Sequence, residues 1–443
     1  MDDSTLTDNS AVSRDIAGLP IADLARRFGT PCYVYDARRM VRQIELLRCF
    51  DVVRYAQKAN SNLAILDLMR QSGVLLDAVS AGELWRAKAA GYAWRGEPAP
   101  VVFTADIFDS ESLEMVAEHG IHVNCGSPDM IEQYGHICPD REVTLRINPG
   151  FGHGHSLKTN TGGPHSKHGI WHEQLEQVLK QCQRYRLAVT GMHMHIGSGS
   201  DFEHLSMVCR AMESLAATVG SSLRTISAGG GLPTPYRAGE SNMDIERYFD
   251  HWHTTRLRIE SQIGNSIRLE VEPGRFPVAE AGYLLTEIRA VKQMGPNRFY
   301  LVDAGFNNLA RPVLYGAYHP ISVAAGDGRP LNEFDDVIVG GPLCESGDIF
   351  TQGDGGTVLK RRLPSARPGD WLVIHCAGAY GFSMSSNYNS KPLAAEVLIE
   401  NGRPYLIRPR QNSRDLFESE IIPEWTLSGE TRSRLDEATA DRR

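Results

Sequence analysis

The chain has 443 residues, of which 42% are hydrophobic and 23% charged, and its formal net charge is −8. This composition is typical of a globular protein with a core, long enough for two or three domains, and the negative balance argues against a nucleic-acid or anionic-membrane partner. No apolar run is long enough to cross a membrane, and the start "MDDSTLTDNSAVSRD" lacks the pattern of a signal peptide. The eight cysteines form no CxxC pair, so we expect reduced thiols in a cytoplasmic protein.

Short apolar runs alternate with helical patterns through the first two thirds of the chain. Helices are predicted at 80–92, where Ser80 is a candidate N-cap with Glu83 three residues on, and at 201–220. The predicted strands lie at 52–58, 74–80, 100–106, 121–127, 143–149, 188–197, 224–231 and 267–274. Eight strand-then-helix units favour an α/β protein with a closed TIM-type (β/α)8 barrel, and a doubly wound open sheet is the alternative.

After about residue 285 the pattern changes to strands without long helices between them. Strands are predicted at 298–305, 335–343 and 370–380, and a hairpin at 396–409 with Asn401-Gly402 as its turn. This region is expected to form a C-terminal β-sandwich or β-barrel-like domain, which the short strand at 31–36 would join. The expected divisions are a partly disordered N-terminal tail 1–28, a strand segment 29–37 of the β-domain, a barrel 38–285, a β-domain 286–422 and a polar tail 423–443.

Reactive side chains lie at or near the ends of the predicted barrel strands, where barrel enzymes have their active sites. They are Lys58, Asp77, Arg146, His195, glycines 229–231 and Glu272. Read alone, Lys58 could be a surface amine that reaches water, although the apolar run before it favours a nucleophilic amine. The three glycines suit either a phosphate site or a tight turn. Glu272 beside Gly274-Arg275 suits either a site or a surface ion pair.

Two further motifs leave alternatives open. His193 and His195 lie on one face of a strand, and with His153, His155 and His168 they would suit a metal-dependent barrel hydrolase. No HxxxH or paired-carboxylate pattern accompanies them, however. Cys344 and Glu345 lie in a glycine-bounded loop of the β-domain, where the cysteine is either an inert thiol or a proton donor.

Taken together, these motifs resemble one family. "AQKANSN", "HMHIGSG", "SAGGGL", "EPGRF", "VDAGFNNLARPVLYG", "GPLCESGD" and "GAYGFSMSSNYNSKP" resemble the motif set of the pyridoxal-phosphate decarboxylases with an alanine-racemase-type barrel, in order from about residue 29 to 420. Within that group they are similar to the diaminopimelate decarboxylase branch. The resemblance implies a pyridoxal 5′-phosphate (PLP) enzyme that converts meso-2,6-diaminopimelate to L-lysine and CO2, the last step of lysine biosynthesis.

The resemblance also implies a role for each matching residue. Lys58 would hold PLP as a Schiff base, His195 would stack on its ring, and Glu272 would bond the ring nitrogen. Cys344, given by the partner subunit of a homodimer, would protonate the product carbon. The implied cofactor-binding residues are Lys58, Asp77, Arg146, His195, Ser198, Gly230, Gly231, Glu272, Gly274, Arg275 and Tyr380, and the substrate-binding residues are Arg275, Arg311, Tyr315, Glu345 and Tyr380. No metal is implied.

The substrate is less specified than the cofactor, because related enzymes on the same scaffold decarboxylate different amino acids. A decarboxylase of a related amino diacid, or of a basic amino acid in a specialised pathway, is therefore an alternative, and a non-catalytic relative is another. Arg311 favours a diacid, since a substrate that ends in a cation has no need of an arginine there.

Overall fold

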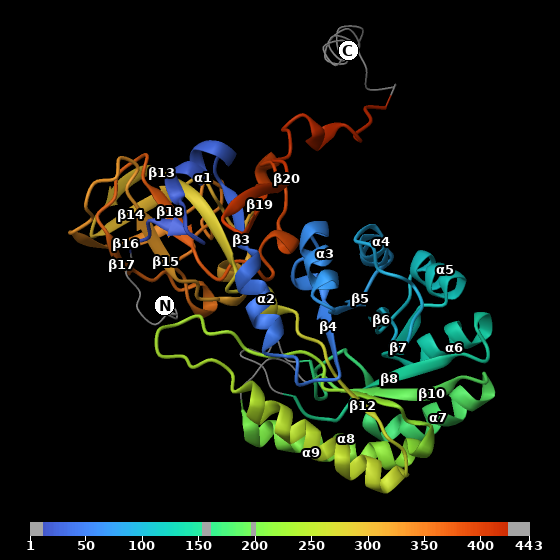
Figure 1. Ribbon diagram of the computed structural model, residues 1–443. Coiled ribbons are helices and arrows are strands. Elements are labelled where there is room, and N and C mark those ends of the chain that lie inside the picture. Colours follow the sequence, from blue (N-terminus) through green and yellow to red (C-terminus); the bar gives the residue numbers. More distant parts are fainter. Residues whose placement is uncertain (1–11, 153–160, 196–200, 424–443) are drawn as a thin grey trace.

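The computed structural model describes residues 12–152, 161–195 and 201–423. Within them a helix-ringed barrel lies beside a domain built of strands (Figure 1). No helix in these ranges has the length and apolar character that a membrane crossing requires.

The eight predicted barrel strands are all present, and they close into a parallel ring. The closing pair is β12 with β4, where Glu270 is the partner of Val52, and β10 pairs in parallel with β8. In ring order the strands are β4 (Val52–Ala56), β5 (Leu75–Ala78), β6 (Val101–Ala105), β7 (His122–Cys125), β8 (Glu142–Asn148), β10 (Ala188–His193), β11 (Thr225–Ser227) and β12 (Arg268–Val271). The barrel prediction is confirmed, and the open-sheet alternative is wrong because the last strand bonds the first.

Helices cover the outside of this ring. Both predicted helices are present, and the Ser80 side chain caps its helix by accepting a hydrogen bond from Glu83 N at 3.2 Å. The helices are α2 (Ala37–Glu45), α3 (Leu63–Gln71), α4 (Ala81–Ala89), α5 (Ser110–His119), α6 (Pro128–Ile137), α7 (Leu175–Arg184), α8 (Phe202–Val219) and α9 (Ile245–Ile263). The short helix α10 (Arg275–Val278) instead follows β12 at the carboxyl ends of the strands. A short β9 (Ile170–Trp171) pairs with β8.

The second domain is a mixed sheet organised around one long strand, β13 (Gly282–Met294), which pairs with β3, β14 and β18. Its other elements are β3 (Cys32–Asp36), β14 (Asn297–Val302), α11 (Arg311–Tyr315), β15 (Ile321–Ala324), β16 (Phe334–Gly340), β17 (Arg361–Pro364), β18 (Trp371–Ile374), β19 (Ala395–Glu400) and β20 (Arg403–Arg408). The β19–β20 hairpin is the predicted one. Asn401 and Gly402 both have positive φ, 50° and 72°, as a two-residue hairpin turn requires.

The structure differs from the expected divisions at two places. The expected boundary at residue 285 falls inside β13, which runs continuously from Gly282. Residues 15–28, expected within a tail, form the strand pair β1 (Asp15–Ile16) and β2 (Leu19–Pro20) and the helix α1 (Ile21–Phe28). Their apolar side chains are buried against the β-domain, and this burial stabilises the segment. The sequence did not predict it, because a short segment with polar flanks does not show what it packs against.

The two domains are joined at the loop that follows β4. Glu396 of β19 is fully buried and accepts hydrogen bonds from Tyr35 Oη at 2.7 Å and from Asn62 Nδ2 at 2.9 Å. The backbone N–H of Tyr380 donates to Ala59 O at 2.8 Å. The β-domain therefore fixes the conformation of the segment that contains Lys58.

Candidate active site

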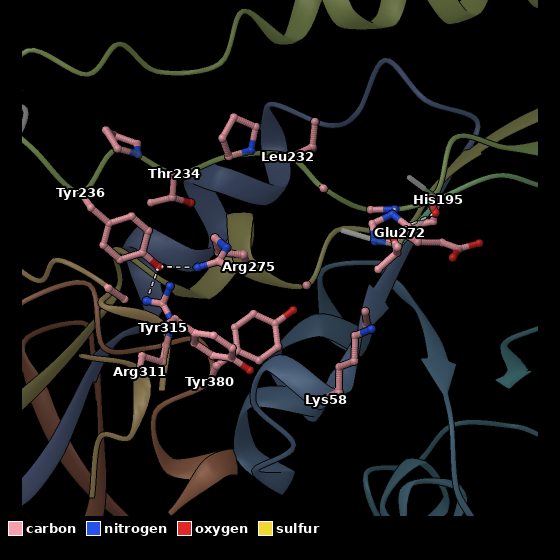
Figure 2. Close-up of a pocket in the computed structure, with 18 of the residues that line it drawn as sticks. Lys58, His195, Leu232, Thr234, Tyr236, Glu272, Arg275, Arg311, Tyr315 and Tyr380 are labelled. Atoms are coloured by element: carbon pink, nitrogen blue, oxygen red, sulfur yellow. Dashed lines mark hydrogen bonds between the residues drawn. The ribbon is translucent and has the colours of Figure 1, made fainter. Parts of the chain in front are cut away.

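A cavity of about 910 Å³ opens at the carboxyl ends of the barrel strands and is completed by the β-domain. The structure brings twelve of the sequence-predicted site residues together around it (Figure 2). They are Lys58, Asp77, Arg146, His195, Gly230, Gly231, Glu272, Gly274, Arg275, Arg311, Tyr315 and Tyr380. Ser198 lies outside the described residues, and Cys344 and Glu345 are not in the wall of this cavity.

Lys58 does not lie on the strand that was expected to carry it. The strand β4 ends at Ala56, and Lys58 is the middle residue of a 3-10 turn, η1 (Gln57–Ala59). Its two neighbours in the turn are buried while its own side chain is exposed in the cavity. Figure 2 shows the side chain extending toward the part of the cavity lined by Glu272 and His195. The amine is thus accessible to a ligand.

Glu272, directly after β12, is a buried carboxylate with fixed orientation. Its Oε1 accepts a hydrogen bond from Ser227 Oγ at 2.6 Å, and His193 Nε2 lies 3.2 Å from its Oε2. Burial raises the pKa of Glu272, while the Ser227 hydrogen bond and nearby arginines act in the opposite direction. A carboxylate held in this way can accept a hydrogen bond from a cationic N–H and stabilise its charge.

Asp77, at the end of β5, is the second buried acid of the cavity. Burial and the proximity of Glu272 raise the pKa of Asp77 to about 8, although the Lys58 charge acts in the opposite direction. Its Oδ1 is buried and has no hydrogen-bond partner among the described residues. Such an atom is satisfied when a ligand or a donor group enters the cavity.

His195 presents a neutral imidazole. The N–H of Gly230 donates to its Nδ1 at 3.0 Å, so the ring proton is on Nε2. Burial lowers the pKa of His195 well below its ordinary value, and the charges of Arg146 and Lys58 add to this effect. A neutral, flat ring on a cavity wall is suited to stacking on an aromatic ligand.

The glycine turn after β11 is shaped by close approach. A Cβ at Gly230 would lie 2.6 Å from Glu272 O, and Gly231 has a φ of +96°, which residues other than glycine rarely adopt. The turn therefore brings backbone atoms to the cavity surface. The N–H groups of Gly229 and Gly230 donate to Ser227 Oγ and His195 Nδ1, so an anion would bind to other N–H groups at this surface.

Cationic side chains and a phenol form the wall opposite Lys58. Arg275 Nη1 and Arg311 Nη1 both donate to the hydroxyl oxygen of Tyr236, at 2.9 and 3.0 Å (Figure 2). Burial lowers the pKa of Arg311, and the Arg275 charge acts in the same direction. Among the described residues, neither guanidinium has an acidic partner. Two adjacent cations without a counter-ion are a site for an anion.

Sequence reasoning missed Tyr236, which lines this wall, and His319, which contacts Arg311 of the wall. Tyr236 lies in the long loop between β11 and α9, where no strand end predicts a site, and His319 is a buried residue of the β-domain. His319 Nδ1 donates to His375 O at 2.9 Å, so its Nε2 is free to accept from Arg311 Nη1 at 3.0 Å. A tyrosine just after the glycine turn, in "GGGLPTPYR", was the only available signal.

Cys344 and Glu345 lie on the outer surface of the molecule. Both are exposed, in a loop after β16. The loop is well fixed: Cys344 N donates to Asn389 Oδ1 at 2.7 Å, and buried Asp348 accepts from Leu343 N at 2.8 Å. A fixed loop that presents a thiol and a carboxylate outward can contribute them to a neighbouring molecule.

The histidines of the described residues do not assemble the metal site that the sequence suggested as an alternative. In the described part of the chain, no three His, Cys, Asp or Glu side chains are grouped as metal ligands. His193 Nδ1 contacts Asn124 Nδ2 at 3.0 Å, and His168 Nδ1 contacts Asp106 Oδ2 at 2.6 Å. His153 and His155 lie outside the described residues.

The chain is similar to known proteins over most of its length. Residues 37–279 match the family model described as "Pyridoxal-dependent decarboxylase, pyridoxal binding domain". A diaminopimelate decarboxylase of Escherichia coli strain K12 is 52% identical over 418 residues, which are 94% of this chain and 98% of that protein.

Two solved structures agree with this result. A crystal structure of a diaminopimelate decarboxylase has a TM-score of 0.88 and 53% identity, and the match covers 91% of this chain and 96% of the other. The diaminopimelate decarboxylase of Helicobacter pylori complexed with L-lysine has a TM-score of 0.79 and 30% identity, with 91% and 99% covered.

Proposed function

Because this chain belongs to the diaminopimelate decarboxylases of the pyridoxal-dependent decarboxylase family, we propose that it releases CO2 from meso-2,6-diaminopimelate to give L-lysine. It is a PLP-dependent carboxy-lyase. This substrate assignment is supported by Arg275 and Arg311, two adjacent cations on the wall opposite Lys58 that have no acidic partner among the described residues. A basic amino acid would place its terminal cation against these two guanidinium groups, whereas the far carboxylate of a diacid would neutralise them.

The cavity fits PLP. It is lined by the accessible amine of Lys58, the buried carboxylate of Glu272 and the neutral imidazole of His195. The buried Oδ1 of Asp77 has no hydrogen-bond partner among the described residues. The glycine turn, Gly274 and the Tyr380 hydroxyl offer an anion its donors nearby. In our proposal Lys58 would bind PLP through its amine, His195 and Arg146 would contact its ring, and Ser198, Gly230, Gly231, Gly274, Arg275 and Tyr380 would hold its phosphate.

When bound, PLP accepts the electron pair left at Cα as the bond to the carboxylate breaks. Glu272 keeps a proton on the ring nitrogen, because its carboxylate stabilises the N–H cation, and so maintains the electron-accepting power of the ring. Lys58 would hold the cofactor, and Asp77, which lines the same cavity, would tune proton transfer beside it. Cys344 would be the group that donates a proton to Cα of the substrate.

The far end of the substrate sets the orientation of its reacting end. Arg275 and Arg311 hold the distal carboxylate, while Tyr315, Tyr380 and Glu345 complete the pocket, with Glu345 as acceptor for the distal ammonium. Held at both ends, the substrate presents one carboxylate to the cofactor, and orientation of this kind lowers the barrier for its loss.

The substrate assignment is tested by measuring CO2 release from the purified, PLP-loaded protein with diaminopimelate isomers, lysine, ornithine and arginine. We expect meso-diaminopimelate to have the highest kcat/KM. A preference for lysine, ornithine or arginine would contradict the assignment while leaving the decarboxylase chemistry intact. Low activity on every substrate of the panel would favour a different amino diacid.

We also propose a homodimer in which each active site contains Cys344 and Glu345 of the second copy. Support comes from their exposed, fixed loop outside the cavity of their own protomer. We further propose a cytoplasmic location, because all eight cysteines are free thiols.

Mixing two inactive variants tests the shared site. Each mixed Lys58→Ala/Cys344→Ala dimer has one intact site and one doubly defective site, so complete exchange should restore roughly a quarter of the wild-type activity. Each variant alone, and mixtures of differently tagged Lys58→Ala copies, are the controls. If co-purification of two tags proves exchange but no activity returns, each site uses its own cysteine.

A further inference from the structure

The Tyr236 hydroxyl has a hydrogen-bonding capacity that the protein leaves unused. Its oxygen accepts from Arg275 Nη1 at 2.9 Å and from Arg311 Nη1 at 3.0 Å. A guanidinium has no acceptor atom, so neither arginine can receive the phenol's own proton. Among the described residues no acceptor for that proton is present, although the side chain is only half-buried and lines the cavity. The phenol is therefore a donor directed at whatever occupies the cavity.

The position of this donor is fixed in advance. Glu240 Oε2 accepts from Tyr236 N at 2.7 Å and from Arg237 N at 3.1 Å, which closes a turn in the β11–α9 loop. The ring lies edge-on to His319, with centroids 5.4 Å apart and planes at 78°. The Arg311 guanidinium lies 4.9 Å from its ring centre. Ring and backbone are held by contacts that do not involve the hydroxyl proton.

The neighbouring cation is oriented by the same group. The two protons of Arg311 Nη1 go to Tyr236 Oη and to His319 Nε2, both neutral acceptors. The orientation of the Arg311 guanidinium is thus fixed by neutral groups, and no protein carboxylate among the described residues neutralises its charge. Arg275, Tyr236 and Arg311 form a row of donors, in which Tyr236 comes from the barrel and Arg311 from the β-domain (Figure 2).

We propose that Tyr236 is a substrate-binding residue whose hydroxyl donates a hydrogen bond to the distal carboxylate held by Arg275 and Arg311. This inference rests on the proposed function, since it assigns the third donor of the diacid site. A carboxylate has two oxygens and accepts several hydrogen bonds, so a third donor between two cations adds to their attraction. The hydroxyl also favours diacids over other ligands, because a ligand without a distal carboxylate has no acceptor for the phenol proton.

Tyr236→Phe removes only the hydroxyl and keeps the ring that packs against His319. The measurement is the Kd of the PLP-loaded protein, by titration calorimetry, for pimelate and for 1,5-diaminopentane. Pimelate has the carbon chain and both carboxylates of diaminopimelate but no amine, whereas 1,5-diaminopentane has amines and no carboxylate. We expect the Kd for pimelate to rise about tenfold, the low end for a hydrogen bond to a charged group, and the Kd for 1,5-diaminopentane to stay level.

Tyr318→Phe is the matched control. Tyr318 lines the same cavity, and its ring lies against the guanidinium groups of Arg237 and Arg361, at 4.3 and 3.6 Å. Its hydroxyl makes no hydrogen bond within the described residues, so its removal should change neither Kd. A thermal melt of each variant checks that the fold is intact.

The result that overturns the inference is an unchanged pimelate Kd in Tyr236→Phe, or an equal rise for both ligands, which would indicate a purely structural role. Failure of the wild type to bind pimelate would also overturn it. These outcomes are independent of catalysis. If the wild type binds pimelate through Tyr236 but releases no CO2 from diaminopimelate, the proposed substrate is wrong and the anion site stands.

Discussion

Lys58→Ala should lose CO2-releasing activity by at least about 10²-fold, the low end for a positioned group that takes part in the chemistry. The structure places this lysine on a short turn with its side chain in the cavity, near the buried acids Asp77 and Glu272. The wild type should be yellow when loaded with PLP. Borohydride reduction should fix the cofactor to the peptide that contains Lys58, as mass spectrometry of a digest will show.

Lys88→Ala is the matched control, because Lys88 lies on the outer helix α4 with its amine 5.5 Å from the Trp94 ring centre, away from the cavity. It should keep full activity and normal labelling at Lys58. Labelling of another lysine in the wild type would contradict the assignment. A protein that stays colourless after loading with PLP would also contradict it.

Arg311→Leu should greatly reduce the preference of the enzyme for a diacid over a basic amino acid. Removing this guanidinium leaves the distal carboxylate of diaminopimelate without its fixed partner, which costs about 2–5 kcal/mol for a buried charge pair. Since 1.4 kcal/mol is a factor of ten, kcat/KM for diaminopimelate should fall by more than about tenfold. Lysine lacks this carboxylate, so any turnover of lysine should stay level or rise.

Arg237→Leu provides the control for this experiment. Arg237 lies in the same cavity wall and stacks on Tyr318, but it is not part of the row formed by Arg275, Tyr236 and Arg311. Its loss should leave the preference for diaminopimelate in place. Diaminopimelate turnover that survives Arg311→Leu would show that the substrate assignment is wrong even though the cofactor chemistry holds.

Much of the barrel could be predicted because its strands are local features. Each of the eight runs is short, apolar and followed by a helical pattern, and the eight barrel strands lie within the predicted ranges or one residue beyond them, whereas the two-residue strand β9 was not predicted. Residues at the ends of such strands meet at one face of the ring whatever the details of packing. Lys58, Asp77, Arg146, His195 and Glu272 therefore reach one cavity, as their positions in the sequence indicated.

The sequence by itself determined the number of barrel strands, the hairpin at Asn401-Gly402 and the family, because periodicity, turn chemistry and motif order are properties of neighbouring residues. Only the tertiary structure decided the rest. Helix α1 is ordered by burial against a sheet formed far along the chain, and Tyr236 becomes part of the site because its loop is directed at Arg311 of the other domain. Cys344 faces outward for the same kind of reason, since the direction of a loop depends on contacts such as those of Asp348. Such contacts join residues distant in sequence, and no local pattern encodes them.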